Sequence, residues 1–494
     1  MYDLIIRNAR ILDGDGGETA GAVAVRDGRI AAVVPQGGEF DAGAREDIDA
    51  AGLALAPGFI DIHTHDDTNV IRQPAMLPKL SQGVTTVVVG NCGISASPVR
   101  LRGEPPDPMN LLGDAGHFVY PRFADYRNAV DTARPAVNVA ALVGHTALRQ
   151  NHMDRLDREA SDAEIAAMRA ELDDALSCGA LGLSTGLAYA SAFSSSTDEV
   201  KALAEVLDAH GGVYTTHLRT EFDGILDALD EAFEIGRHAR SPVIVSHLKC
   251  AGAGNWGRSR EVIPRLENAA GRHPVGCDCY PYSASSSTLD LKQVTDEFDI
   301  LITWSTPHPE EAGRKLADIA AGWGVPMLDA ARRLQPAGAV YFGMDENDVR
   351  HILAHPLTMV GSDGLPNDPL PHPRLWGAFP RVLGHYSRDV GLFPLAEAVR
   401  KMTGLSADRF GLTDRGRIRA GHCADLVLFD PDRIRDVASF GDPQQAADGI
   451  RGVWVNGVLS YRDKTATGLR AGRFLPRQTD VRTTFNAQQE NSHV

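Results

Sequence analysis

The chain has 494 residues, 43% of them hydrophobic and 23% charged, which is typical of a globular protein with a large core. Its net charge of -16 argues against a nucleic-acid partner and against binding to an anionic membrane, since both require a basic surface. The sequence contains neither a run of about 18 apolar residues nor the pattern of a signal peptide. Six cysteines are too few for a disulfide scaffold, so we expect reduced thiols and a cytoplasmic location.

The first segment, residues 2–55, is predicted to be β structure. Short apolar runs alternate there with clusters of glycine and aspartate, as at Asp13–Gly17 and Asp27-Gly28, and no helical periodicity is present. We therefore expect several short strands joined by tight turns.

From Pro57 onward, short apolar runs alternate with longer segments that have helical spacing, such as Ser161–Cys178. Continuous apolar runs of this length are typical of strands buried on both faces of a parallel sheet. The eight runs are Gly58–Ile62, Val84–Val89, Val137–Val143, Ala180–Leu183, Gly212–Thr216, Pro242–Ser246, Pro274–Cys279 and Leu357–Val360. Eight strand–helix units predict an α/β protein built on a (β/α)8 barrel of the TIM type.

The gap between the seventh and eighth runs is too long for a structureless loop. It contains helix-like segments, so we expect an inserted subdomain at about residues 283–350. After about residue 413 the β character returns, and Val455-Asn456-Gly457-Val458 is a strong hairpin signal. The predicted organisation is a barrel over 58–413 and a small β-sandwich domain formed by residues 1–57 and 414–494.

Potential metal ligands follow five of the eight predicted strands. His63 and His65 stand two apart after the first strand, where alternate side chains point to the same face. Active sites of this fold lie at the carboxyl ends of the strands. The other strand-end residues are Cys92, His217, His247 and Asp363. One cysteine and two histidines provide three protein ligands and leave a fourth zinc position for water, which is the catalytic pattern.

These residues resemble the amidohydrolase superfamily. Many members carry a carboxylated lysine at the end of strand four, whereas this chain has Gly182–Gly186 there without a lysine. The departure favours the branch in which a cysteine on strand two is the ligand, the N-acyl-D-amino-acid deacylases. Further motifs similar to that family are Gly90–Gly93, Ser246–Lys249, Tyr280–Tyr282, Gly361–Gly364, His372–Arg374, Gly421–Asp430 and Val455–Gly457.

The predicted metal sites follow from the motifs and from this resemblance. Cys92, His217 and His247 are expected to hold one tightly bound catalytic Zn²⁺. The resemblance implies a second, weaker site at His63 and His65, with Cys92 as a candidate bridge between the two. A zinc-bound thiol is deprotonated, so we expect Cys92 to be a thiolate.

Five further residues complete the predicted site. Asp363 is the candidate general base, which takes a proton from the attacking water and returns it to the leaving amine. Lys249, Tyr280 and Arg374 are expected to bind the substrate carboxylate, and the resemblance supports all three. His145, at the end of strand three, is predicted to face the mouth of the barrel, either as a substrate contact or as a hydrogen-bond partner of other site residues.

The expected reaction is hydrolysis of the amide bond of a small N-acyl-D-amino acid, with the D configuration implied by the resemblance alone. Relatives specific for acidic side chains carry an arginine after Tyr-Pro-Tyr, whereas Pro281–Gly313 contains only Lys292 as a cation besides histidine. This favours neutral or hydrophobic side chains. The alternatives are an N-acyl-D-glutamate or N-acyl-D-aspartate deacylase, a cyclic-amide hydrolase, and a non-catalytic scaffold, which should have lost ligands. The sequence does not indicate an oligomeric state.

Overall fold

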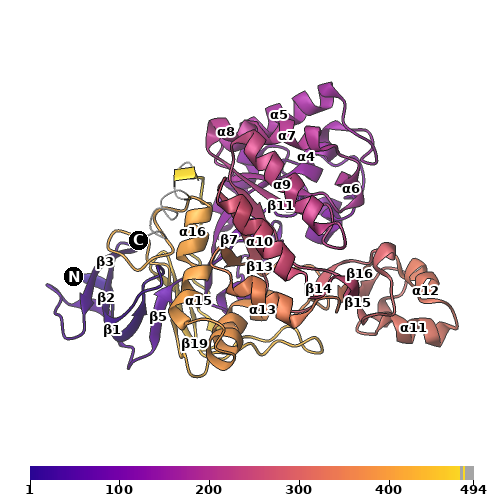
Figure 1. Ribbon diagram of the computed structural model, residues 1–494. Helices are drawn as coiled ribbons and strands as arrows, with labels where there is room; N and C mark the ends of the chain where they lie inside the picture. Colours follow the sequence, from indigo (N-terminus) through magenta and orange to yellow (C-terminus); the bar gives the residue numbers. More distant parts are fainter. Residues whose placement is uncertain (479–481, 484, 486–494) are drawn as a thin grey trace.

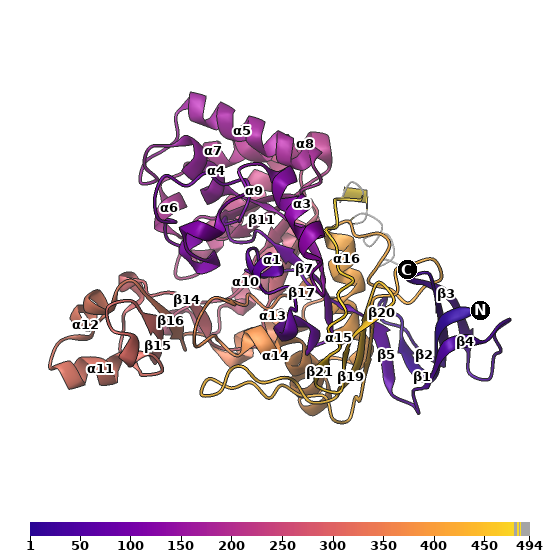
Figure 2. The ribbon, with the colours of Figure 1, turned by 180° about the vertical axis from the view of Figure 1, so that it is seen from behind.

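The computed structural model describes residues 1–478, 482, 483 and 485, and its centre is a barrel of parallel strands (Figures 1 and 2). The barrel strands are β6 (Phe59–Asp61), β7 (Val84–Val89), β8 (Asn138–Ala141), β9 (Val143–Gly144), β10 (Gly182–Gly186), β11 (Val213–His217), β12 (Val243–Val245), β13 (Val275–Cys279) and β17 (Thr358–Val360). Only Leu142 separates β8 from β9, so the two form one strand position. A parallel bridge between Thr64 and Gly364 joins the segments that follow β6 and β17 and closes the ring. The predicted (β/α)8 fold is confirmed.

The barrel strands are buried on both faces, which explains their continuous apolar sequences. One set of side chains fills the barrel interior, including Val88, Leu181, Val213, Ile244 and Met359. The alternate set packs outward against the helices in the largest core cluster. The barrel is therefore a packed core, and the polar groups that could bind a ligand lie at its ends.

Helices flank the barrel (Figure 1). They are α1 (Asn69–Arg72), α2 (Leu77–Leu80), α3 (Phe123–Ala133), α4 (His145–His152), α5 (Asp162–Ser177), α6 (Ala190–Phe193), α7 (Thr197–Ala204), α8 (Val206–His210), α9 (Ile225–Ala239), α10 (Ser259–Ala270), α13 (Glu346–Ala354), α14 (Arg374–Arg381), α15 (Leu395–Met402) and α16 (Gly404–Arg409). In α5, Ser161 and Glu164 form a reciprocal capping box, and Met168 and Leu172 are buried. The helical spacing of Ser161–Cys178 therefore predicted this helix.

Both ends of the chain contribute to one nine-stranded sheet. It contains β1 (Tyr2–Leu12), β2 (Glu18–Arg26), β3 (Arg29–Pro35), β4 (Ala44–Asp49), β5 (Ala54–Pro57), β18 (Leu426–Phe429), β19 (Ile450–Val455), β20 (Val458–Arg462) and β21 (Thr465–Ala466). Strand β5 pairs with β18, and Figure 2 shows β5 in one sheet with the later strands β19 and β20. Asn456 and Gly457 both have positive φ between β19 and β20, as the predicted hairpin requires. The domain boundaries stay a prediction, and residues 486–494 lie outside the described part.

The inserted segment folds around a small core of its own and projects from the barrel (Figure 1). Its sheet has the order β14 (Ser285–Thr288), β16 (Ala337–Tyr341) and β15 (Ile300–Ser305), covered by α11 (Leu316–Trp323) and α12 (Met327–Leu334). The helices of this segment were predicted from the sequence, whereas its strands were not. Strand β14 reads Ser-Ser-Ser-Thr and has no apolar alternation, so only pairing with β16 makes it a strand.

Candidate metal centre

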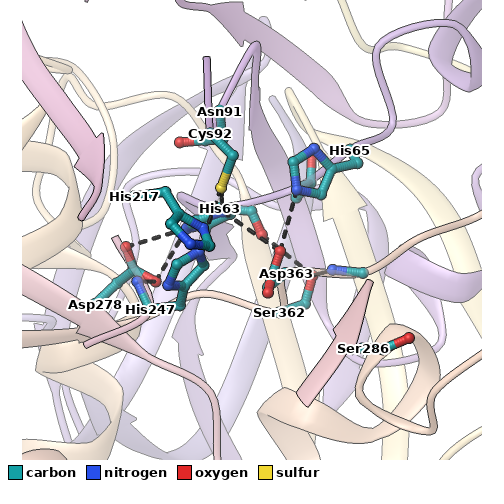
Figure 3. A network of polar contacts seen from close by, with 12 residues as sticks. His63, His65, Asn91, Cys92, His217, His247, Asp278, Ser286, Ser362 and Asp363 are labelled. Atoms are coloured by element: carbon teal, nitrogen blue, oxygen red, sulfur yellow. Dashed lines mark hydrogen bonds and ion pairs between the residues drawn. The ribbon is translucent and has the colours of Figure 1, made fainter. Parts of the chain in front are cut away.

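The candidate ligands meet at the mouth of the barrel because each one ends a strand or follows it closely. His63 and His65 follow β6, Cys92 follows β7, His217 ends β11 and His247 follows β12, all with buried side chains. Figure 3 shows the sulfur of Cys92 pointing into the space among the imidazoles, with the carboxylate of Asp363 on the other side. The parallel strands thus bring residues that are far apart in the sequence together at one point.

The first group consists of Cys92, His217 and His247, whose potential ligand atoms lie within 4.8 Å of one another. Sγ of Cys92 is 3.3 Å from Nε2 of His247. Cys92 and His247 have φ values of 53° and 36°, which side-chain-bearing residues seldom adopt and which often mark functional sites. Gly93 must be glycine here, since a Cβ would lie 2.6 Å from the backbone nitrogen of Gly186.

The second group consists of His63, His65, Cys92 and Asp363, again within 4.8 Å of one another. Nε2 of His63 is 3.2 Å from Sγ of Cys92, and Nε2 of His65 is 3.1 Å from Oδ1 of Asp363. Cys92 belongs to both groups, as a bridging ligand would. The carboxylate of Asp363, which the sequence placed among the potential ligands and marked as the candidate general base, completes this group.

The electrostatics of the centre favour anionic Cys92 and Asp363. Burial raises the pKa of the Cys92 thiol, but the charges of His63 and His247 outweigh it and hold that pKa well below its usual value. Burial opposes ionisation of Asp363 as well, yet Arg374 and His63 keep its pKa well below the ordinary range. A thiolate and a carboxylate therefore face the imidazoles.

The donor set fits zinc. A thiolate and two imidazoles are ligands that Zn²⁺ binds in catalytic sites with one open position. Nδ1 of His217 is buried and has no hydrogen-bond partner, whereas its Nε2 faces Glu221. Buried polar atoms are rarely left unpaired, so this nitrogen points to a ligand that belongs between the strand ends.

Two groups of residues that support the ligands were missed by the sequence analysis. Asp278 in β13 lies 3.2 Å from Nδ1 of His63 and accepts a hydrogen bond of 3.0 Å from the backbone N–H of His247. Lys79 is fully buried and donates to Asp61 at 2.8 Å and to Ser362 at 2.9 Å, which ties β6 to the segment beside Asp363. The carboxylate of Asp278, isolated in the apolar run Val-Gly-Cys-Asp-Cys, was a detectable signal, whereas Lys79 lies on a short helix with no such pattern.

A cavity of about 680 Å³ opens beside the ligands. His65, His217, His247 and Asp363 form its inner end, and Lys249 and Tyr280 lie on its wall. Its outer wall comes from the inserted segment, residues 285–293, and from the loop and helix at 188–193. The cavity is therefore shared between the barrel and the insertion.

Two predicted substrate-binding residues do not line this cavity. Arg374 is 1% exposed, and its Nη1 lies 2.8 Å from Oδ2 of Asp363 while its Nη2 donates to the carbonyl of Ser286 at 3.0 Å. His145 is buried, and its Nε2 lies 2.9 Å from Oε1 of Glu199. In this structure Arg374 contacts the candidate base, and His145 belongs to a buried polar network.

Known proteins resemble this chain over almost its whole length. The family model described as "Amidohydrolase family" matches residues 46–461. D-aminoacylase of Alcaligenes xylosoxydans xylosoxydans is 49% identical over 96% of this chain and 98% of its own length. A D-aminoacylase structure described as having a binuclear metal centre has a TM-score of 0.94 and 49% identity, covering 97% of this chain and 100% of that one.

Two further relatives act on acidic substrates. N-acyl-D-aspartate deacylase of Alcaligenes xylosoxydans xylosoxydans is 48% identical over 96% of this chain and 95% of its own length. N-acyl-D-glutamate deacylase of Bordetella bronchiseptica, solved with zinc and a phosphonate mimic of the tetrahedral intermediate, has a TM-score of 0.92 and 46% identity, covering 97% and 100% of the two chains. The chain thus belongs to the amidohydrolase family, and the predicted resemblance to the N-acyl-D-amino-acid deacylases is confirmed.

Proposed function

We propose that this protein is a zinc-dependent deacylase that hydrolyses the amide bond of N-acyl-D-amino acids. The observation that carries the proposal is the convergence of Cys92, His217 and His247 beside the carboxylate of Asp363, at the inner end of a cavity large enough for a small substrate. The D configuration of the substrate is supported by the relatives, which act on N-acyl-D-amino acids.

Cys92, His217 and His247 would hold the tightly bound ion, and His63 and His65, with Cys92 shared, a weaker one. When bound, zinc supplies a Lewis acid that polarises the amide carbonyl and lowers the pKa of water. Asp363 accepts the proton of the attacking water and gives it to the nitrogen of the leaving amine. Its low pKa keeps the carboxylate ionised at neutral pH, so it carries no proton when the water attacks.

Lys249 and Tyr280 are the wall residues suited to the substrate carboxylate, because an ammonium and a phenol both donate hydrogen bonds to an anion. Arg374 lies behind Asp363 and would support binding of the substrate carboxylate indirectly. Its guanidinium carbon lies 4.6 Å from the centre of the Tyr280 ring. In the structure Arg374 pairs with Asp363, so its first role in the proposal is to orient the base and keep it ionised.

We propose a preference for neutral side chains. The cavity lining carries Asp107 and Asp290, which repel a second carboxylate on the substrate. One observation favours the alternative of an acidic side chain. Among the cations that line the cavity, Arg219 pairs with Glu231 and Lys249 with Glu221, whereas Lys292 has no ion pair in the described part of the chain.

A substrate panel tests the proposal. The zinc-loaded protein is assayed with N-acetyl-D-leucine, N-acetyl-D-methionine, N-acetyl-D-glutamate, their L counterparts and a hydantoin. We expect hydrolysis of the D substrates, fastest for leucine and methionine, and little of the L substrates. Turnover confined to the hydantoin would instead assign the protein to cyclic-amide hydrolysis, and a preference for glutamate would select the acidic alternative.

We also propose a cytoplasmic location, supported by six cysteines that are all free. No described helix is both long and apolar enough to cross a membrane. Fractionation of cells that express the protein with its own N-terminus tests the location, with recovery in the periplasm as the contrary result.

A further inference from the structure

Glu221 touches three residues of the proposed site. It lies in the loop between β11 and α9, four residues after His217, and is 7% exposed. Its Oε1 is 3.0 Å from Nδ1 of His247 and 2.5 Å from Nζ of Lys249. Its Oε2 is 3.7 Å from Nε2 of His217. One buried carboxylate thus contacts two candidate zinc ligands and a candidate substrate-binding cation.

The two nitrogens of His247 face different partners. Nε2 points to the centre, 3.3 Å from Sγ of Cys92, whereas Nδ1 points to Glu221. A nitrogen that binds a metal carries no proton, so neutral His247 must carry its proton on Nδ1. That N–H needs an acceptor, and Oε1 of Glu221 is placed to accept it.

Lys249 competes for the same nitrogen. Its Nζ is 2.9 Å from Nδ1 of His247 and also donates to the backbone carbonyl of His247 at 3.3 Å. An ammonium group only donates, so Lys249 could bind Nδ1 only if that nitrogen carried no proton. The proton would then be on Nε2, which could no longer bind a metal. Glu221 removes this conflict because its Oε1 accepts from both donors.

We propose that Glu221 is a positioning residue that keeps the proton of His247 on Nδ1 and so leaves Nε2 free for the metal, against the competing donor Lys249. The same carboxylate steadies His217, whose Nδ1 is buried without a partner and whose Nε2 faces Glu221. The carboxylate therefore links the tight metal site to the cation expected to bind the substrate carboxylate. The inference rests on the proposed function, both for zinc at Cys92, His217 and His247 and for the role of Lys249.

A double-mutant cycle on zinc affinity tests the inference. Zinc affinity is measured by chelator competition on metal-free protein for the wild type, Glu221→Ala, Lys249→Met and the double variant. We expect Glu221→Ala to weaken the tight site about 10- to 100-fold, as is typical for carboxylates that orient metal-binding histidines. Lys249→Met should bind zinc within about twofold of the wild type. The double variant should recover most of the loss, because the competing donor is gone.

Two controls keep the test decisive. Glu231→Gln changes a carboxylate that pairs with Arg219 and touches no candidate ligand, and it should leave zinc affinity unchanged. Glu221→Gln keeps the shape of the side chain and is taken through the same cycle in case the alanine variant does not fold; we expect a smaller loss with the same recovery. Wild-type affinity in both Glu221 variants, or no recovery in the double variants, would overturn the inference.

The outcome is separable from that of the proposed function. Zinc affinity is measured without a substrate, so a protein inactive on N-acyl-D-amino acids could still show the expected cycle. Conversely, normal deacylase activity with an unaffected zinc site in the Glu221 variants would reject the inference and leave the proposed function intact.

Discussion

The two ends of the cavity are built in different ways. At the inner end, His65, His217 and His247 lie at or just beyond strands whose positions are set by parallel hydrogen bonding around a closed barrel. At the outer end, the wall comes from residues 285–293 of an insertion that has its own core. The first arrangement is set mainly by the pairing of the barrel strands, whereas the second belongs to a segment that folds around its own core and can change without disturbing the barrel. We therefore expect substitutions at the inner end to change the rate of hydrolysis, and substitutions at the outer end to change the preference for the substrate side chain.

The largest effect is expected at the inner end. Cys92→Ala removes the ligand shared by both groups, so the protein should lose its tight zinc and more than about 10⁴-fold of kcat/KM, since several kcal/mol of transition-state stabilisation depend on the metal. Metal analysis and kinetics on one preparation check this. Cys178→Ala, which changes a thiol outside both ligand groups, should retain zinc and activity. Retention of zinc by Cys92→Ala would refute the ligand assignment.

Asp363→Asn separates proton transfer from metal binding. The variant should keep the tight zinc, because Asp363 belongs to the other ligand group, and should lose about 10²–10⁴-fold in kcat. Steady-state kinetics with zinc quantified on the same sample provide the measurement. Near-normal turnover would remove Asp363 from the role of base.

Asp278→Asn should affect one metal site more than the other. The carboxylate lies 3.2 Å from Nδ1 of His63, so its loss should weaken the second site about 10- to 100-fold. The tight site should change less, since Asp278 meets only the backbone of His247. Stepwise zinc titration followed by calorimetry separates the two sites. Equal weakening of both would show that the two groups are not independent.

The outer end should change preference without changing chemistry. Ser287 lies on the cavity wall, and Ser287→Arg adds a cation there. We expect the ratio of kcat/KM for N-acetyl-D-glutamate over N-acetyl-D-leucine to rise about tenfold, or about 1.4 kcal/mol, with zinc content unchanged. Ser283→Arg, outside the cavity lining, is the matched control. An unchanged ratio would place the substrate side chain elsewhere.

The smallest effect is expected away from both ends. Ser161→Ala removes the N-cap of α5 and should cost about 1 kcal/mol of the free energy of unfolding, with wild-type kinetics. Denaturant titration measures the cost, and Asp162→Ala, which does not cap the helix, is the control. A fall in activity would mean that this helix is coupled to the site.

The inner end was largely predictable from the sequence, and the outer end was not. Each barrel strand is a continuous apolar run, so the order of the runs along the chain is enough to place the residues that follow them at one mouth of the barrel. Whether Arg374 meets the substrate or Asp363 depends on side-chain packing that no spacing encodes. Lys79, Glu221 and strand β14 were missed because their roles arise from tertiary contacts.

The most direct test of the account is a zinc titration of metal-free protein with N-acetyl-D-leucine as substrate. The account predicts negligible hydrolysis without metal, then activity that rises in proportion to added zinc until about one ion per chain fills the site at Cys92, His217 and His247. Full activity in the metal-free protein, or inactivity at every zinc concentration despite a bound ion, would contradict it.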